Sequence, residues 1–176
     1  MSLRRSLRFL FSASALALGG CALFATPPPP TPARPPRPNY DLVASIRAAG
    51  EREKSIIDVT PLRDPAVPIL QEGARADERA GRYPDAAAKL DQALKLSPES
   101  PDLLQDRAEI AVRLRNFPMA EKLAHQSWSL GPKLGPLCAR NWQTVVEMRL
   151  QADDSAGAAS ARKWVQTCHK AGINRY

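Results

Sequence analysis

The side chains that could take part in covalent or acid–base chemistry are few in this sequence. It contains three cysteines, Cys21, Cys138 and Cys168, and two histidines, His125 and His169. No Gly-rich phosphate loop, metal-spaced His/Cys cluster or pair of carboxylates at a defined separation accompanies them. Cys168 and His169 are neighbours, but adjacent residues of a helix point about 100° apart, so they do not form a nucleophile–base pair. The sequence therefore predicts no enzyme, no metal or cofactor site and no small-molecule substrate.

Cys138 and Cys168 have a spacing that suits a disulfide across a helical hairpin. Each lies about fifteen residues from a turn near Asp153, which places both at about 22 Å from that turn in two antiparallel helices. A bridge would close a loop of about 30 residues and stabilise the last hairpin by about 3–4 kcal/mol. The spacing favours a disulfide, and two buried free thiols are the alternative.

The charge of the chain does not indicate a nucleic-acid partner. The 176 residues carry a formal charge of +7, with 44% hydrophobic and 24% charged residues. Arg4, Arg5 and Arg8 supply three of these charges before any acid appears, which leaves +4 for residues 21–176. That remainder is too small to predict a basic footprint for nucleic acid.

Residues 1–20 have the layout of a secretory signal peptide. Arginines near the start precede an apolar run ending at Leu18, which is shorter than the roughly 20 residues that a membrane-spanning helix needs. Leu18, Gly19, Gly20 and Cys21 resemble a bacterial lipobox, in which small residues precede a cysteine whose sulfur takes a diacylglycerol. The resemblance implies cleavage before Cys21 and membrane anchoring through its lipid, with palmitate labelling. A plain signal peptide cut elsewhere is the alternative.

The residue after Cys21 bears on the membrane that receives the protein. In bacterial lipoproteins an aspartate there acts as an inner-membrane retention signal, and this chain has Ala22. The resemblance thus implies the outer membrane, facing the periplasm. With Cys21 lipidated, two cysteines remain, and an even number suits an oxidising compartment.

A proline-rich segment follows the anchor within residues 21–39. Residues 27–38 hold eight of the 17 prolines, which fix φ and remove backbone donors, so polyproline II is favoured. At about 3.1 Å per residue the segment spans roughly 37 Å and predicts a semi-rigid spacer. A PxxP ligand for a partner groove is the alternative. Residues 40–66 then predict a short helix and an extended connector.

Residues 67–100 and 101–134 align without a gap at a spacing of 34. Each unit has two amphipathic runs separated by a short break, which predicts a helical hairpin. The breaks are Gly81-Arg82 and Arg115-Asn116. The matched pairs are Leu70 and Leu104, Ala74 and Ala108, Tyr83-Pro84 and Phe117-Pro118, Ala86 and Ala120, Leu96 and Leu130, and Pro98 and Pro132.

These units resemble the tetratricopeptide repeat (TPR). The residues of the first unit that agree with its pattern are Gly81, Tyr83, Ala86, Leu90, Ala93 and Pro98. Leu70 replaces the usual early Trp, and Asp77 replaces the usual first-helix Tyr. A divergent third hairpin follows from Gly135, as expected of a terminal repeat. The implied fold class is all-α, a short α-solenoid of about three hairpins over residues 67–172, with residues 173–176 as a tail.

In the resembled family, first helices line a groove that takes an extended peptide or a partner helix. Counting along these helices gives the candidate protein-binding residues Gln71, Arg75, Arg79, Gln105, Glu109, Arg113, Gln143 and Glu147. Gln105 and Glu109 stand where some relatives carry a Lys/Asn clamp for a C-terminal carboxylate, so chaperone-tail recognition is not expected. A plain solvated surface is the alternative. Trp128, Trp142 and Trp164 have apolar-face spacing and are interpreted as packing residues.

The resemblance implies a membrane-anchored periplasmic lipoprotein whose repeat domain is a protein-interaction scaffold in the cell envelope. The protein partner cannot be identified from the sequence. One alternative is a regulatory accessory subunit of a cell-wall enzyme. Another is a structural lipoprotein that contacts peptidoglycan through Arg75, Arg79, Arg113 and Arg115.

Overall fold

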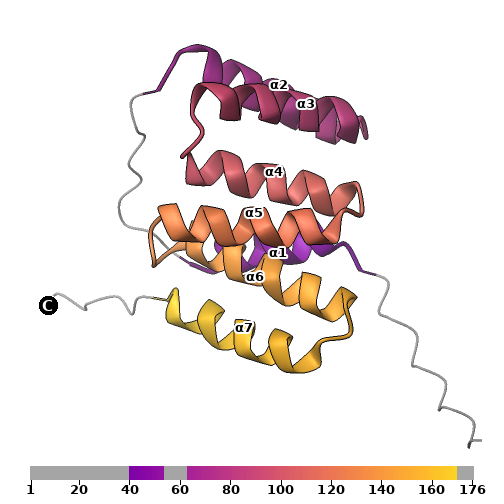
Figure 1. The fold of residues 1–176 in the computed structure, drawn as a ribbon, viewed down its shortest axis with the longest axis vertical. Helices are drawn as coiled ribbons and strands as arrows, with labels where there is room; N and C mark the ends of the chain where they lie inside the picture. Colours follow the sequence, from indigo (N-terminus) through magenta and orange to yellow (C-terminus); the bar gives the residue numbers. More distant parts are fainter. Residues whose placement is uncertain (1–39, 54–62, 170–176) are drawn as a thin grey trace, which may run out of the picture. The chain divides into compact units, whose positions relative to one another are not determined.

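The computed structural model describes residues 40–53 and 63–169, which belong to one unit of the chain (Figure 1). The signal segment, Cys21, the proline-rich spacer and the tail 173–176 lie outside the described residues. The described residues form seven helices and no strand, so the prediction of an all-α fold is confirmed. The helices are α1 (Leu42–Glu51), α2 (Ala66–Arg79), α3 (Tyr83–Leu96), α4 (Pro101–Arg113), α5 (Phe117–Leu130), α6 (Pro136–Gln151) and α7 (Ser155–Thr167).

The pairs α2–α3, α4–α5 and α6–α7 are antiparallel hairpins, and all three turns use the same backbone device. Gly81, Arg115 and Asp153 have φ of 74°, 59° and 61°. In each turn the following amide donates to a carbonyl five residues earlier, as Arg82 N–H does to the Asp77 carbonyl. This left-handed ending terminates the first helix and reverses the chain. The breaks expected at residues 81–82 and 115–116 fall at these turns.

Prolines and side-chain caps start the helices. Proline occupies one of the first two positions of α3, α4, α5 and α6, where its missing N–H costs no helical hydrogen bond. Asn116 accepts the Met119 amide at the start of α5, and Asp154 accepts the Gly157 amide at the start of α7. Each hairpin therefore begins and ends where its local sequence directs.

Small side chains let neighbouring helices approach closely. In the α2–α3 hairpin the buried alanines Ala74, Ala86 and Ala93 surround Leu90, and Leu103 of α4 joins the same cluster. α3 packs on α4 and α5 packs on α6, so the three hairpins stack in sequence (Figure 1). This stacking places the first helices α2, α4 and α6 on one side, which we call the first-helix face.

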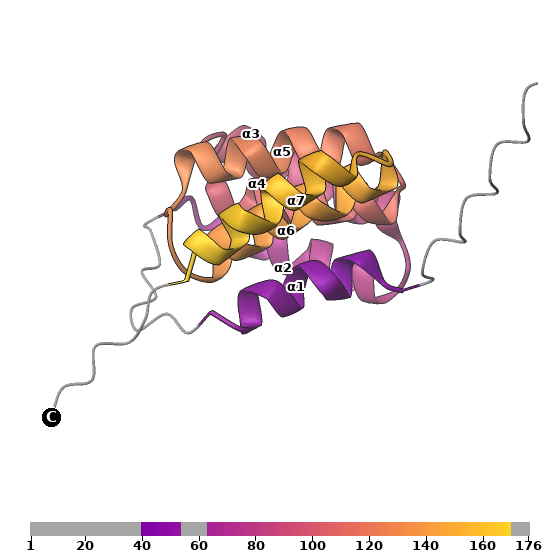
Figure 2. The same ribbon diagram turned by 90° about the horizontal axis from the view of Figure 1, so that it is seen from below.

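The helix α1 lies against the first-helix face, on the side away from α3 and α5 (Figure 2). It packs along α6 and also contacts α4. Its apolar residues Val43, Ile46 and Ala49 are buried, and the Asp41 carboxylate accepts the Ala44 amide at its start. Gly50 permits the close contact, because a Cβ there would lie 2.8 Å from Cγ of Arg140. The sequence indicated a short helix in this region but not where it packs.

The last hairpin is closed by a disulfide. Cys138 in α6 and Cys168 after α7 are bonded, with their Cα atoms 5.6 Å apart. The amide of Gly135, just before α6, also donates to the Cys168 carbonyl. The end of α7 is thus tied to the start of α6. Of the helices described, none has both the length and the apolar character that crossing a membrane requires.

The three tryptophans form one aromatic cluster beside this hairpin. The Trp142 and Trp164 rings stack with centroids 5.2 Å apart, and Trp128 meets both edge-on. Trp142 is buried, in agreement with the interpretation as a packing residue, whereas Trp164 leaves 47% of its surface exposed.

Candidate functional site

The eight candidate protein-binding residues lie on α2, α4 and α6, and the structure divides them into a covered and an open group. Gln105, Glu109 and Glu147 are buried, and Arg113 and Gln143 are half-buried. Gln71, Arg75 and Arg79, all on α2, line an open cavity. The division arises because α1 covers part of the first-helix face and leaves the α2 side open.

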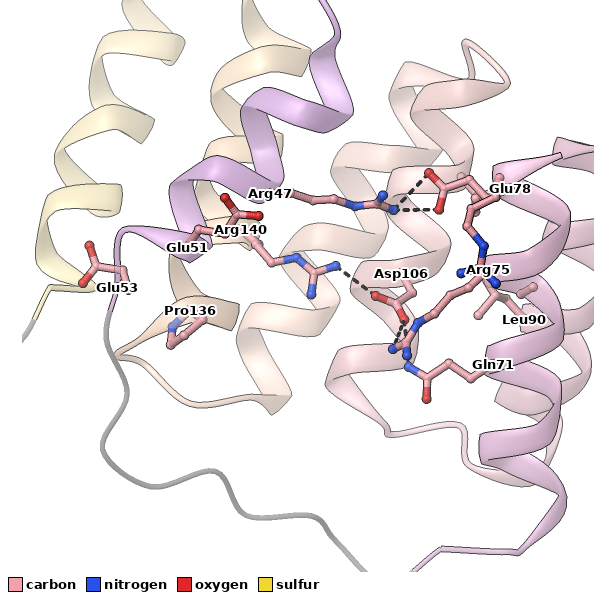
Figure 3. Close-up of a pocket in the computed structure, with 14 residues that line it drawn as sticks. Arg47, Glu51, Glu53, Gln71, Arg75, Glu78, Leu90, Asp106, Pro136 and Arg140 are labelled. Atoms are coloured by element: carbon pink, nitrogen blue, oxygen red, sulfur yellow. Dashed lines mark hydrogen bonds and ion pairs between the residues drawn. The ribbon is translucent and has the colours of Figure 1, made fainter. Parts of the chain in front are cut away.

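The covered part is held by hydrogen bonds from α1 to carboxylates of three different helices. Arg47 Nη2 donates to Glu78 of α2 at 2.7 Å, as Figure 3 shows, and Arg47 Nε donates to Glu109 of α4 at 2.7 Å. The Ser45 hydroxyl donates to Glu147 of α6 at 2.7 Å, and the Tyr40 hydroxyl donates to the same carboxylate. α1 therefore satisfies acceptors across the whole width of the face.

At the start of α1 the roles are reversed, because there the carboxylate belongs to the α1 segment and the arginine to α4. The Arg113 guanidinium donates to the Asp41 carboxylate at 2.8 Å. Burial raises the pKa of Asp41, but the hydrogen bonds from Arg113 and from the Ala44 amide outweigh it, so the net pKa is lower than usual. Burial and the hydrogen bond to Glu147 together raise the pKa of Tyr40 to about 12. The start of α1 is therefore held by the ion pair of Asp41 with Arg113 and by the neutral Tyr40 hydroxyl, which donates to Glu147.

A second network shares Glu109 with Arg47, and two of its members, Arg140 and Asp106, were not singled out from the sequence. Arg140 of α6 donates to Glu109 at 2.6 Å and to Asp106 at 2.9 Å. Burial lowers the pKa of Arg140, but the charges of Glu109 and Asp106 outweigh it and hold the pKa above its ordinary value. Gln105 donates to Glu109 as well, at 3.0 Å. The buried carboxylate of Glu109 is thus neutralised from both sides, as burial of a charge requires.

The open part is a cavity of about 560 Å³ bounded by the end of α1, by α2 and α4, and by the start of α6 (Figure 3). Ala74, Leu90 and Ile110 give it apolar lining. Arg75 and Arg79 stand on its α2 side with more than half of each side chain exposed. The cavity combines an apolar interior with cations that water still reaches, which suits a peptide or a side chain of another protein.

The α2 residues are tied only loosely to this network. Gln71 donates to Asp106 at 2.7 Å, whereas Arg75 lies 3.7 Å from the Asp106 carboxylate. Arg79 donates to Glu72 at 3.1 Å, in an exposed pair. Such exposed pairs contribute little stability, so Arg75 and Arg79 can change partners at low cost.

Other polar residues noted in the sequence lie apart from the cavity lining. Arg115 stacks over the Phe117 ring at 5.7 Å, His125 meets Trp142 edge-on, and His169 lies 3.0 Å from Glu53. Within residues 40–53 and 63–169, no three His, Cys, Asp or Glu side chains gather as a metal site. Of the four arginines named for peptidoglycan contact, Arg75 and Arg79 line the cavity, whereas Arg113 and Arg115 do not.

Comparison with known proteins agrees with the repeat seen in the structure. The tetratricopeptide repeat family model matches residues 79–133. The globular C-terminal domain of P. aeruginosa LpoP is similar, with 28% identity and a TM-score of 0.56 over 60% of this chain and 99% of that one. No curated protein matches the chain at a significant level.

Two further solved structures share the fold. The first TPR domain of Spaghetti (RPAP3), bound to the HSP90 peptide SRMEEVD, is 18% identical with a TM-score of 0.54, over 61% of this chain and 84% of that one. The Aspergillus fumigatus Sgt2 TPR domain is 21% identical with a TM-score of 0.56, over 64% of this chain and 72% of that one. Residues 79–133 thus match the tetratricopeptide repeat, the described residues have an all-α solenoid fold, and the likeness to LpoP supports a bacterial lipoprotein that carries such repeats.

Proposed function

We propose that this protein is a lipid-anchored scaffold of the cell envelope that binds another protein through its first-helix face and catalyses no reaction itself. The observation that carries the proposal is the open cavity beside α1, where Ala74, Leu90 and Ile110 lie next to the solvated cations Arg75 and Arg79. Solenoid repeats use this kind of extended face for binding. The match of residues 79–133 to the repeat family model and the likeness to LpoP support a protein-interaction role.

The anchoring part of the proposal rests on the sequence. Cys21 carries the lipid, and residues 27–38 hold the repeat domain away from the outer membrane on its periplasmic side. Replacement Cys21→Ser is expected to abolish palmitate labelling and partition into detergent. A Cys21→Ser protein that still takes up palmitate would refute lipidation at this residue.

A second candidate function uses the same face. The protein would be a regulatory subunit of a cell-wall enzyme, so that binding changes the rate of its partner. The likeness to LpoP, which extends over nearly all of that domain, supports this candidate as well. A scaffold leaves the activity of its captured partner unchanged, and a regulator alters it.

The binding face is tested by cross-linking in cell envelopes followed by capture of the protein. The double variant Arg75→Ala/Arg79→Ala is expected to lose the partners that the unaltered protein captures, with a melting temperature lowered by no more than a few degrees. The matched control is Lys95→Ala/Lys122→Ala, which removes the same charge from two residues that do not line the cavity. Equal capture by both double variants would show that the partner binds elsewhere. The captured protein is then assayed with and without this chain to separate scaffold from regulator.

A further inference from the structure

The helix α1 occupies the face that the proposed function assigns to a partner, and the inference below rests on that function. Its contacts cross from α2 to α6, because its donors reach Glu78, Glu109 and Glu147. The first-helix face in this structure therefore already holds a helix. What remains open is the cavity at the C-terminal end of α1, which Gly50 and Glu53 help to line.

The surface beneath α1 has the chemistry of an interface. Glu109 and Glu147 are almost fully buried in its presence, and both accept hydrogen bonds from α1. A permanent core gains little from buried carboxylates, since their desolvation costs as much as their pairing returns. On a face that is covered at some times and wet at others, the same carboxylates can be hydrated when the helix leaves. The same surface also has apolar residues, since Ala111, Val112 and Met148 form one cluster with Val43 and Ile46 of α1. Its buried carboxylates are the feature that fits a helix that comes and goes.

The helix itself is too short to be stable alone. It has ten residues, and isolated helices shorter than about 12–15 residues are marginal in water. Its buried apolar residues are Val43, Ile46 and Ala49, of which only Ile46 is large. α1 is therefore held as a helix by the face it covers, in the manner of a peptide that folds on binding.

We propose that α1 is an internal ligand of the first-helix face and that the partner presents a helix of the same kind, which displaces it. That helix carries an arginine in the place of Arg47, to reach Glu78 and Glu109. It carries small or β-branched apolar residues four positions before, one before and two after the arginine, as Val43, Ile46 and Ala49 stand in α1. The open cavity next to α1 gives the partner a place to bind before α1 leaves.

Hydrogen exchange of the full chain, unaltered, tests whether α1 leaves the face. Amides of α1 are expected to exchange at least tenfold faster than those in the centres of α4 and α6, because they open without unfolding of the hairpins. Equal protection of α1, α4 and α6 would overturn the proposal, since α1 would then open only with the whole domain.

A peptide supplied in trans tests whether the face accepts such a helix. The probe is a fluorescein-labelled peptide of residues 40–53, added to the full chain and to its Ile46→Asp variant, in which the internal helix is weakened. The variant is expected to bind the peptide at least tenfold more tightly than the unaltered chain, because its own α1 no longer competes. The control peptide carries Arg47→Glu, which faces Glu78 and Glu109 and should not bind.

The peptide experiment distinguishes an α1 that can be displaced from an α1 that is part of the core. A folded Ile46→Asp chain that ignores the peptide, or one in which α2–α7 unfold, shows that α1 is part of the core and overturns the inference. Failure of the proposed function looks different, because α1 then opens and the peptide binds while no captured protein depends on Arg75 and Arg79. Capture that depends on these arginines with an α1 that never opens refutes this inference alone.

Discussion

Residues in the left-handed backbone region end the first helix of every hairpin. Gly81 has φ of 74° and Arg115 has φ of 59°, at positions 34 residues apart in the repeat. Glycine adopts this conformation freely, whereas a residue with a Cβ is strained by about 1–2 kcal/mol. The two turns are therefore similar in geometry and unequal in strain.

Opposite substitutions at these turns should have opposite effects on stability. Gly81→Ala is expected to lower the free energy of unfolding by about 1 kcal/mol, because nothing within 4 Å of the new Cβ compensates for the strain. Arg115→Gly should raise the free energy of unfolding by a few tenths to about 1 kcal/mol. Loss of the contact between Arg115 and the Phe117 ring reduces this gain. Urea unfolding followed by circular dichroism measures both. Two changes of the same sign would contradict this account.

Asp77 is a buried carboxylate in a place where the repeat pattern usually has Tyr. Hydrogen bonds from Lys89 and then from Arg82 hold the pKa of Asp77 below its ordinary value. Because the folded pKa is lowered, Asp77 stabilises the fold above its unfolded pKa of about 3.9, and this contribution disappears as the pH falls through the folded pKa. The ion pairs replace the apolar contact that the usual residue would make.

Asp77→Asn should therefore destabilise the protein at neutral pH and not in acid. The difference in free energy of unfolding between the variant and the unaltered protein is expected to shrink steadily below about pH 4. Urea titrations between pH 7 and pH 2 follow it, with Asp85→Asn as the control for an exposed aspartate on the neighbouring helix. A difference that stays constant with pH would assign the effect to packing.

At the scale of the helices, close contact with α6 outweighs helix propensity at one position of α1. Alanine favours a helix over glycine by about 1 kcal/mol, so Gly50→Ala alone would strengthen α1. A Cβ there would lie 2.8 Å from Cγ of Arg140 and 3.0 Å from the Pro136 carbonyl oxygen, and the latter cannot move aside easily. The packing of α1 therefore requires the weaker helix former.

Gly50→Ala should increase the helicity of an α1 peptide and yet loosen α1 in the protein. In hydrogen exchange the α1 amides of the variant are expected to exchange several-fold faster than those of the unaltered chain. Gly73→Ala in α2 is the matched control, because its Cβ meets only the side chain of Lys89, which can move. Slower exchange of α1 in Gly50→Ala would mean that propensity dominates.

The sequence predicted the hairpins well because their signals are local. The 34-residue spacing, the turn residues Gly81 and Arg115 and the prolines after the turns each act within a few residues of their own position. The covering of Glu109 and Glu147 could not be predicted in the same way. Apolar spacing in residues 40–54 indicates a helix and its buried side but not which distant helices it meets, and the Arg140 network depends on that choice.

At the scale of the molecule, the fold is a row of units that each contact mainly the next. α2–α3 packs on α4–α5, which packs on α6–α7, while α1 joins α6 and α4. In such solenoids stability is close to a sum over units and the interfaces between neighbours. Loss of a cross-link in the last hairpin should therefore destabilise mainly that hairpin and its neighbours. The disulfide between Cys138 and Cys168 is such a cross-link.

Reduction of this disulfide should destabilise one end of the domain and leave the other protected. The chain-entropy model gives a loss of about 3–4 kcal/mol for the closed loop, which falls on α6 and α7. Hydrogen exchange with and without a reductant is expected to show faster exchange in α7 first. It should then show faster exchange in α1, because α1 packs on α6, with α2 and α3 unchanged. The Cys138→Ala/Cys168→Ala variant should show the exchange rates of the reduced protein, and these rates should not change when the reductant is added. Uniform acceleration across all seven helices would mean that the hairpins unfold as one unit, which contradicts the local effect expected here.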